Sequence, residues 1–227
     1  MLPSQTVENY LKTIYLAQAA MASNDALVPM GQIASALGVV PGTATTMVKT
    51  LAESGLVKYE PYMGVRLTAA GEKLASRVLR RHRLIELFLV KVLGMNWTDV
   101  HDEAERLEHA VSEQLVDRID AMLGHPLVDP HGDPIPTAEG TMPDAAAIGR
   151  IDLLSAPLAT PLVVTRVLDQ DAEFLRYVED HHLMPGSAIF VEARDAGSDA
   201  VRLRSGDGSH TTLGTRAASQ ILVRLQS

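Results

Sequence analysis

The chain contains no cysteine among its 227 residues. A disulfide scaffold, a zinc site built on thiolates and a cysteine nucleophile are therefore excluded. Aromatic residues are scarce, at 4%, and no apolar run approaches the ~18 residues that a membrane-spanning helix requires. The opening segment, MLPSQTVENY, lacks the basic and apolar stretches of a signal peptide. We therefore expect a cytoplasmic protein with no membrane partner.

An excess of basic charge is also missing, because the formal net charge is −8. Taken alone, this value argues against nucleic acid as a partner. The charge is unevenly spread, however. Residues 1–72 carry four basic and five acidic side chains, residues 73–150 carry nine and 13, and residues 151–227 carry seven and ten. The nearly neutral first third permits a DNA-binding domain, and the acidic excess lies downstream of it.

Residues 1–72 have the pattern of a winged helix-turn-helix domain. Apolar residues recur at helical spacing over 6–20, a short helix is expected over 30–37, and Pro41 suits the first turn of a third helix. Two short β-like runs then surround a turn. Helix, helix, turn, helix and hairpin describe a winged helix-turn-helix, with a generic small α+β domain as the alternative.

The rest of the chain predicts a helical domain and then a β-domain, so the fold class is α+β. Residues 73–145 carry one apolar helix ending near Gly94 and a second continuing to Met122, which together look like a dimerisation unit. Residues 146–161 are assigned to a linker. Residues 162–227 predict a small SH3-like β-barrel from strands at 163–165, 189–191, 201–203 and 221–223, with one helix over 172–180.

Imidazole and carboxylate side chains concentrate on the two expected helices of the middle domain. His82 and Glu86 stand at i and i+4, so they share one helix face and can chelate one ion. The same kind of spacing recurs on the following helix, where three donors stand at i, i+3 and i+4. Solvated helix surfaces are the alternative explanation. The six candidate ligands are His82, Glu86, His101, Glu105, Glu108 and His109.

The third helix of the N-terminal domain supplies the candidate DNA contacts. Its short hydroxyl side chains suit phosphates and thymine methyl groups better than bidentate base contacts. Arg66, on the expected wing, is a candidate for a phosphate or the minor groove. The candidates on the helix are Gly42, Thr43, Thr45, Thr46 and Lys49.

Three motifs on this framework resemble the metal-dependent repressor family of the diphtheria toxin repressor and the manganese transport regulator. They are RHRLIE at 81–86, VHDEAERLEH at 100–109 and PHGDPIP at 130–136. The resemblance spans nearly the whole chain and points to the three-domain, manganese-responsive type. It implies a homodimer that binds a palindromic operator when loaded with Mn(II) or Fe(II) and represses metal-uptake genes.

The resemblance also implies how the ligands are divided between two sites. One site would use His82, Glu86 and His101, completed by donors of the C-terminal domain, for which Asp171 and Glu173 are the nearest acids. The other would use Glu105, Glu108 and His109, completed from the first helix, where the family's donor position falls on Asn9. His131, in the PHG motif, is a further candidate for the second site. Asp171 and Glu173 could instead simply favour a helix N-terminus.

Two departures from the family bear on the choice of metal. Iron-responsive members have a cysteine where this sequence has Glu105, so the site offers only nitrogen and oxygen donors. Such harder donors suit Mn(II) better than a thiolate would, and Fe(II) is the second choice. A further carboxylate of the short manganese regulators falls on Lys12, which argues against their paired-metal geometry here.

Two other classes of function remain as alternatives. A winged-helix repressor could respond to an organic ligand bound between the helices, and its DNA affinity would then ignore added metal. A carboxylate-bridged di-metal enzyme would require a Glu-x-x-His motif on each of two helices. The one such spacing here, Glu179 to His182, lies just before Met184-Pro185-Gly186. We therefore expect no enzyme.

Overall fold

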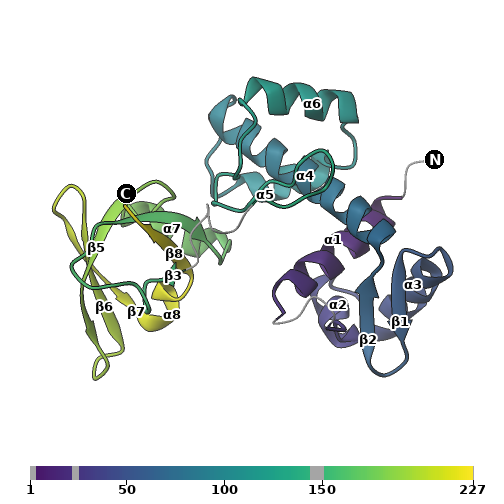
Figure 1. The fold of residues 1–227 in the computed structure, drawn as a ribbon, viewed down its shortest axis with the longest axis horizontal. Coiled ribbons are helices and arrows are strands. Elements are labelled where there is room, and N and C mark those ends of the chain that lie inside the picture. Colours follow the sequence, from purple (N-terminus) through teal and green to yellow (C-terminus); the bar gives the residue numbers. More distant parts are fainter. Residues whose placement is uncertain (1–3, 22–25, 144–150, 227) are drawn as a thin grey trace. The chain divides into compact units, whose positions relative to one another are not determined.

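The computed structural model describes residues 4–21, 26–143 and 151–226 (Figure 1). Its chain divides into two compact units. One comprises Met1–His82 and Pro136–Thr141, and the other Arg83–Ile135 and Met142–Ser227. The division falls within one continuous helix, between His82 and Arg83. No helix in the described ranges is long and apolar enough to cross a bilayer.

The first unit is a winged helix-turn-helix, as the sequence predicts. Helices α1 (Gln5–Ala19), α2 (Met30–Ala36) and α3 (Pro41–Glu53) precede the hairpin of β1 (Val57–Glu60) and β2 (Gly64–Leu67). Side chains from all five elements form one core, because the apolar positions of each helix fall on a single face. Leu11, Ile14, Ile33, Val48, Leu51 and Val65 are almost completely buried in it.

Side-chain and backbone contacts fasten the wing to the helices. The Gln18 side-chain oxygen on α1 accepts a buried 2.9 Å hydrogen bond from the Leu67 backbone N–H on β2. Val28 exchanges both backbone hydrogen bonds with Val65. Gly64 has a φ of 143°, and a Cβ there would lie 2.5 Å from the Val28 carbonyl oxygen. Only glycine allows this close approach.

Helix α4 (Ala69–Lys91) is the centre of the helical region. Leu84 and Leu87 on one side pack with Val116 and Ile119 of α6 (Glu113–Met122). Ile85 and Leu89 on the other side pack with Val100 and Ala104 of α5 (Val100–Leu107). Burial on two faces thus explains the apolar residues in the second half of α4.

The single helix that the sequence predicts up to Met122 is wrong, since α5 ends at Leu107 and α6 begins at Glu113. Ser112 is the physical reason. Its side chain accepts a hydrogen bond from the Leu115 backbone N–H and so caps the N-terminus of α6. Glu108 therefore takes the C-cap position of α5, and His109 lies beyond the helix.

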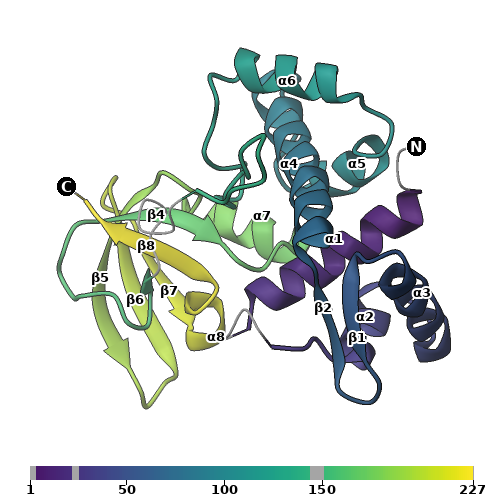
Figure 2. The ribbon, with the colours of Figure 1, turned by 45° about the vertical axis from the view of Figure 1, so that its right-hand side comes forward.

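The C-terminal domain is built on a six-stranded antiparallel sheet (Figure 2). Its strand order is β3 (Ile151–Asp152), β8 (Ile221–Leu225), β4 (Leu162–Val167), β5 (Ala188–Asp195), β6 (Ala200–Ser205) and β7 (His210–Gly214). The same domain contains the helices α7 (Ala172–Asp180) and α8 (Thr215–Ala218). The predicted α+β class with an SH3-like C-terminal domain is confirmed.

The sheet begins earlier in the chain than the sequence indicates. Ile151–Asp152 pairs with β8, and Leu153 and Ala156 are buried in the same core as the sheet residues. These residues lie in the 146–161 segment expected to be a linker, of which 146–150 are outside the described ranges. Strand β7 and helix α8 also have no counterpart among the predicted elements.

Candidate metal centre

Helices α4 and α5 bring four of the predicted ligands together. Nδ1 of His101 lies 3.2 Å from a carboxylate oxygen of Glu86, and Nε2 of the same ring lies 3.8 Å from Glu105. Glu86 is buried, whereas 45% of the His101 side chain is exposed. His82, one turn before Glu86 on α4, forms with Glu86 and His101 a group whose ligand atoms lie within 4.8 Å of one another.

The second predicted group is shared with the first through His82. Ligand atoms of His82, Glu105 and Glu108 also lie within 4.8 Å of one another. Glu108 is fully buried, and its carboxylate lies 3.2 Å from Nε2 of His109. The end of α5 at Leu107 therefore does not separate these donors, because one helical turn still joins Glu105 to Glu108.

A loop between α6 and the sheet supplies a third group. Ligand atoms of Glu86, Asp129 and His131 lie within 4.8 Å of one another, and all three residues are buried. His131 was predicted as a ligand, but Asp129 was not. The signal that could have found it is the Asp-x-His spacing just before Gly132 in the motif that includes PHGDPIP.

The loop holds Asp129 and His131 in place through its own backbone. One oxygen of Asp129, Oδ1, accepts hydrogen bonds from the backbone N–H groups of His131 and Asp133, at 2.8 and 2.9 Å. Gly132, with a φ of 86°, lies directly on β4, where a Cβ would be 1.9 Å from the Thr165 carbonyl oxygen. The other oxygen of Asp129, Oδ2, is buried and has no hydrogen-bond partner within the described residues.

The tautomer of His131 favours a metal-ligating role. Its Nε2 lies 2.9 Å from the Trp97 carbonyl oxygen, which can only accept, so Nε2 carries the hydrogen. Nδ1 of the neutral ring then offers a lone pair. It is buried and without a hydrogen-bond partner in the part of the chain that the structure describes. A backbone carbonyl on the far nitrogen is the usual support of a metal-bound imidazole.

The charges of this group also fit a cation. Burial raises the pKa of Asp129 well above its ordinary value, and the nearby carboxylates of Asp133 and Glu86 raise it further. The Arg83 guanidinium lowers this pKa only in part. A divalent ion would offset both the burial and the repulsion, and imidazole and carboxylate donors match Mn(II) or Fe(II). The residues present therefore fit the metal that the motifs imply.

Asn9 has the environment expected of a side-chain ligand. Its side-chain oxygen on α1 is buried and has no hydrogen-bond partner among the residues described. Its neighbour Glu8 forms a buried 2.6 Å ion pair with Arg81 of α4. Lys12 is also buried. The structure thus fixes the middle of α1 against the first half of α4, which belongs to the same unit.

Asp171 and Glu173 lie elsewhere. Asp171 is the N-cap of α7 and accepts hydrogen bonds from the Glu173 and Phe174 backbone N–H groups. Both acids are exposed and line a surface hollow with Phe174 and Tyr177. Neither belongs to a metal-ligand group found in the described ranges. Their position matches the alternative reading, in which they stabilise a helix N-terminus.

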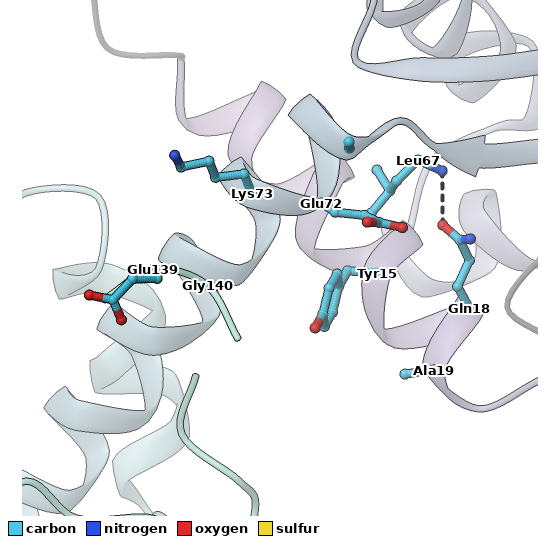
Figure 3. Close-up of a pocket in the computed structure, with 9 residues that line it drawn as sticks. Tyr15, Gln18, Ala19, Leu67, Glu72, Lys73, Glu139 and Gly140 are labelled. Atoms are coloured by element: carbon cyan, nitrogen blue, oxygen red, sulfur yellow. Dashed lines mark hydrogen bonds between the residues drawn. The ribbon is translucent and has the colours of Figure 1, made fainter. Parts of the chain in front are cut away.

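A separate hollow in the first unit contains none of the predicted ligands (Figure 3). It has a volume of about 360 Å³ and lies between α1, the start of α4 and the segment 139–140. Tyr15 and Glu72 border it, and Gln18 lies at its edge with its hydrogen bond to Leu67. None of the metal-ligand groups found among the described residues includes a residue that lines this hollow.

The predicted DNA contacts on α3 lie at its N-terminal and exposed positions. Gly42, Thr43, Thr46 and Lys49 are exposed, and Thr45 is half-buried. The hydroxyls of Thr45 and Thr46 donate to the carbonyl oxygens of Pro41 and Gly42, one turn earlier. Their methyl groups and oxygen lone pairs remain for a partner. Arg66 is half-buried within β2, so it is not at the tip of the wing, where Tyr62 and Met63 are exposed.

Family comparisons cover almost the whole chain. Residues 3–65 match the family described as the N-terminal DNA-binding domain of iron-dependent repressors. Residues 68–137 match the metal-binding and dimerisation domain of the same repressors. Residues 151–225 match the FeoA domain.

Two relatives match different shares of the chain. The iron-dependent repressor IdeR of Mycobacterium leprae is 32% identical over 203 residues, which are 85% of this chain and 86% of that protein. The regulator MntR of Lysinibacillus sphaericus is 36% identical over 118 residues, or 52% of this chain and 81% of that protein. A solved manganese-dependent transcriptional repressor in complex with manganese is 39% identical, with a TM-score of 0.85 and coverage of 97% of this chain and 100% of that one.

Proposed function

The chain belongs to the iron-dependent repressor family of metal-responsive transcriptional repressors, and we propose that its activating ion is Mn(II). The single observation that carries this choice is Glu105, an oxygen donor in the ligand group with His82 and Glu108. Because the chain has no cysteine, the centre holds only imidazole, carboxylate and amide donors. These donors suit Mn(II) and leave Fe(II) as the second candidate. The similar repressor solved with manganese agrees with this choice.

We assign the ligands to two neighbouring positions that share His82. Glu86, His101 and His82 would hold one ion, with Asp129 and His131 available beside Glu86. Glu105, Glu108, His109 and Asn9 would hold the other. Asp171 and Glu173 are left out of the assignment, since Asp171 caps α7 and Glu173 lies in its first turn. When bound, the ion supplies positive charge that cancels the repulsion among the buried carboxylates.

We further propose that the protein binds a palindromic operator as a homodimer. The helical domain would join two copies and set the spacing of their α3 helices at about 34 Å, one turn of DNA. Asn9 links this spacing to the metal, because α1 packs in the same core as α3. The proposal includes a cytoplasmic location, where the DNA is, and no enzymatic activity. It keeps residues 1–72 as the DNA-binding domain and 73–145 as the dimerisation and metal-binding domain.

The role of Glu105 is tested by replacing it with alanine. Glu105→Ala should weaken Mn(II) binding by more than about 100-fold, beyond the usual effect of an outer-shell partner, and abolish metal-dependent operator binding. Glu103→Ala is the matched control, because Glu103 lies on the same helix but pairs with Arg106 at its surface. Calorimetry of Mn(II) binding, with circular dichroism to confirm folding, gives the comparison. Unchanged Mn(II) stoichiometry and affinity in Glu105→Ala would remove Glu105 from the site.

Metal preference is tested with Glu105→Cys. The softer thiolate should move activation of DNA binding from Mn(II) toward Fe(II) or Zn(II). DNA binding is measured under anaerobic conditions with each metal and with a chelator. If the unmodified protein responds to Fe(II) and ignores Mn(II), the argument from donor hardness fails.

A further inference from the structure

Asp133, four residues after the candidate ligand Asp129, is held by side chains from two different elements. Gln170, which follows β4, donates a 2.8 Å hydrogen bond to its Oδ2. Arg166, on β4 itself, forms an ion pair with its Oδ1. Arg83 of α4 lies 3.7 Å from the same carboxylate. Asp133 is 8% exposed, whereas 31% of the Arg166 side chain is exposed.

Backbone contacts dock the same loop on the end of β4. The Val167 N–H donates to the His131 carbonyl oxygen at 2.9 Å, and Gly132 lies against the Thr165 carbonyl. All these residues belong to one compact unit of the fold. The β-domain therefore contacts the loop on both sides of Gly132, at His131 and at Asp133.

Arg83 lies between Asp129 and Asp133, the two acids of the loop. Its Nε lies 3.8 Å from Asp129, and its Nη2 lies 3.7 Å from Asp133. Its Nη1 donates to the Pro134 carbonyl oxygen. Because Arg166 and Gln170 also interact with Asp133, Arg83 does not have to neutralise that carboxylate by itself. Without them, the loop would be held on β4 by the backbone contacts of His131 and Gly132, and Asp133 would keep its contact with Arg83.

We propose that Arg166 is a positioning residue for the metal centre: through Asp133 it holds the 129–133 loop so that Asp129 and His131 face Glu86. The inference rests on the proposed metal-binding function. It differs from the predicted role of the β-domain, which was to donate Asp171 and Glu173 as ligands. The β-domain instead orders a loop that carries ligands. Removing such outer-shell support usually lowers metal affinity by about 10- to 100-fold.

Trp97 offers a readout that requires no metal. It is the one tryptophan of the chain, it is buried, and its ring stacks on His131 with centroids 5.4 Å apart. Arg166→Ala should loosen the loop and shift Trp97 emission to longer wavelength in the metal-free protein. Arg204→Ala is the matched control, because Arg204 is a β-domain arginine of similar exposure that pairs with Glu192. The Trp97 emission of the Arg204→Ala variant should equal that of the unmodified protein.

Mn(II) binding is then measured by calorimetry for the full chain. Arg166→Ala should weaken one class of sites by about 10- to 100-fold, whereas Arg204→Ala should not. Arg166→Lys, which keeps the charge, should recover part of the loss and guards against misfolding of the alanine variant. In a background that carries both Asp129→Ala and His131→Ala, Arg166→Ala should have no further effect, because both ligands that it positions are gone.

The outcomes separate the two claims. If the unmodified protein binds Mn(II) and His131→Ala weakens it, but Arg166→Ala changes neither emission nor affinity, the positioning role is overturned and the proposed function stands. The same holds if Arg166→Ala acts equally in the background that carries both Asp129→Ala and His131→Ala. If the unmodified protein binds no Mn(II), the proposed function fails and the inference fails with it.

Discussion

Asp129 places a buried carboxylate next to those of Glu86 and Asp133, which is costly without a cation. Asp129→Asn keeps an oxygen for the two backbone N–H groups of the loop but removes the charge. We expect the variant to raise the free energy of unfolding of the metal-free protein by about 1–3 kcal/mol, the usual penalty of an uncompensated buried polar group. It should also weaken Mn(II) binding.

The stabilisation of the metal-free protein by Asp129→Asn should increase with pH. Since the pKa of Asp129 is raised in the folded chain, ionisation of Asp129 opposes folding. The advantage of Asn over Asp is therefore complete above the folded pKa and vanishes below the unfolded value of about 3.9. Urea titrations of the metal-free proteins at pH 7 and near pH 4 give the comparison. Greater stability of the unmodified protein at pH 7 would show that Arg83 already compensates the charge.

At the scale of residues, the sequence identified candidate ligands that cluster on helices better than candidates that lie in loops. His82, Glu86, Glu105 and Glu108 follow helical spacing, and the structure brings them together. Asp129 was missed because its position depends on a loop that packs against α4 and β4, which no local pattern records. Asp171 and Glu173 were chosen as the acids nearest to the family's contributing positions, and nothing in their spacing fixes a distance to the other candidate ligands.

At the scale of elements, α3 carries a prediction about DNA binding. Lys49 is exposed on this helix, so Lys49→Ala should weaken binding to all operators similarly. The slope of log K against log salt should fall by ~0.9 if one phosphate contact is lost. Lys91→Ala, at the exposed end of α4, is the control and should leave the slope unchanged. If the slope for Lys49→Ala equals that of the unmodified protein, another face of the domain contacts the DNA.

Elements with strong periodicity were predicted well, and short ones were not. The helix over 172–180 matches α7, because its apolar side chains recur on one face. The break between α5 and α6 was missed since apolar residues continue in helical register through Val111, and only the Ser112 cap marks it. Strand β7, HTTLG, has little apolar alternation and is defined by its pairing with β6.

At the scale of the whole molecule, the order of domains follows from the sequence because each has its own periodicity and core. The boundaries were harder to predict. Residues 151–161 contain two prolines and lie in the expected linker, yet they contribute β3 and two buried side chains to the sheet domain. Whether a strand of two residues forms depends on β8, more than 60 residues later, which a local pattern cannot reveal.

The central claim is that metal and operator binding are coupled in one molecule. The most direct test is to select an operator from random duplexes with Mn(II) present, and then measure Mn(II) affinity with and without that operator. Because coupling is reciprocal, operator DNA should raise Mn(II) affinity by the factor by which Mn(II) raises DNA affinity, typically about 5- to 150-fold. Equal Mn(II) affinities with and without the operator would contradict the account.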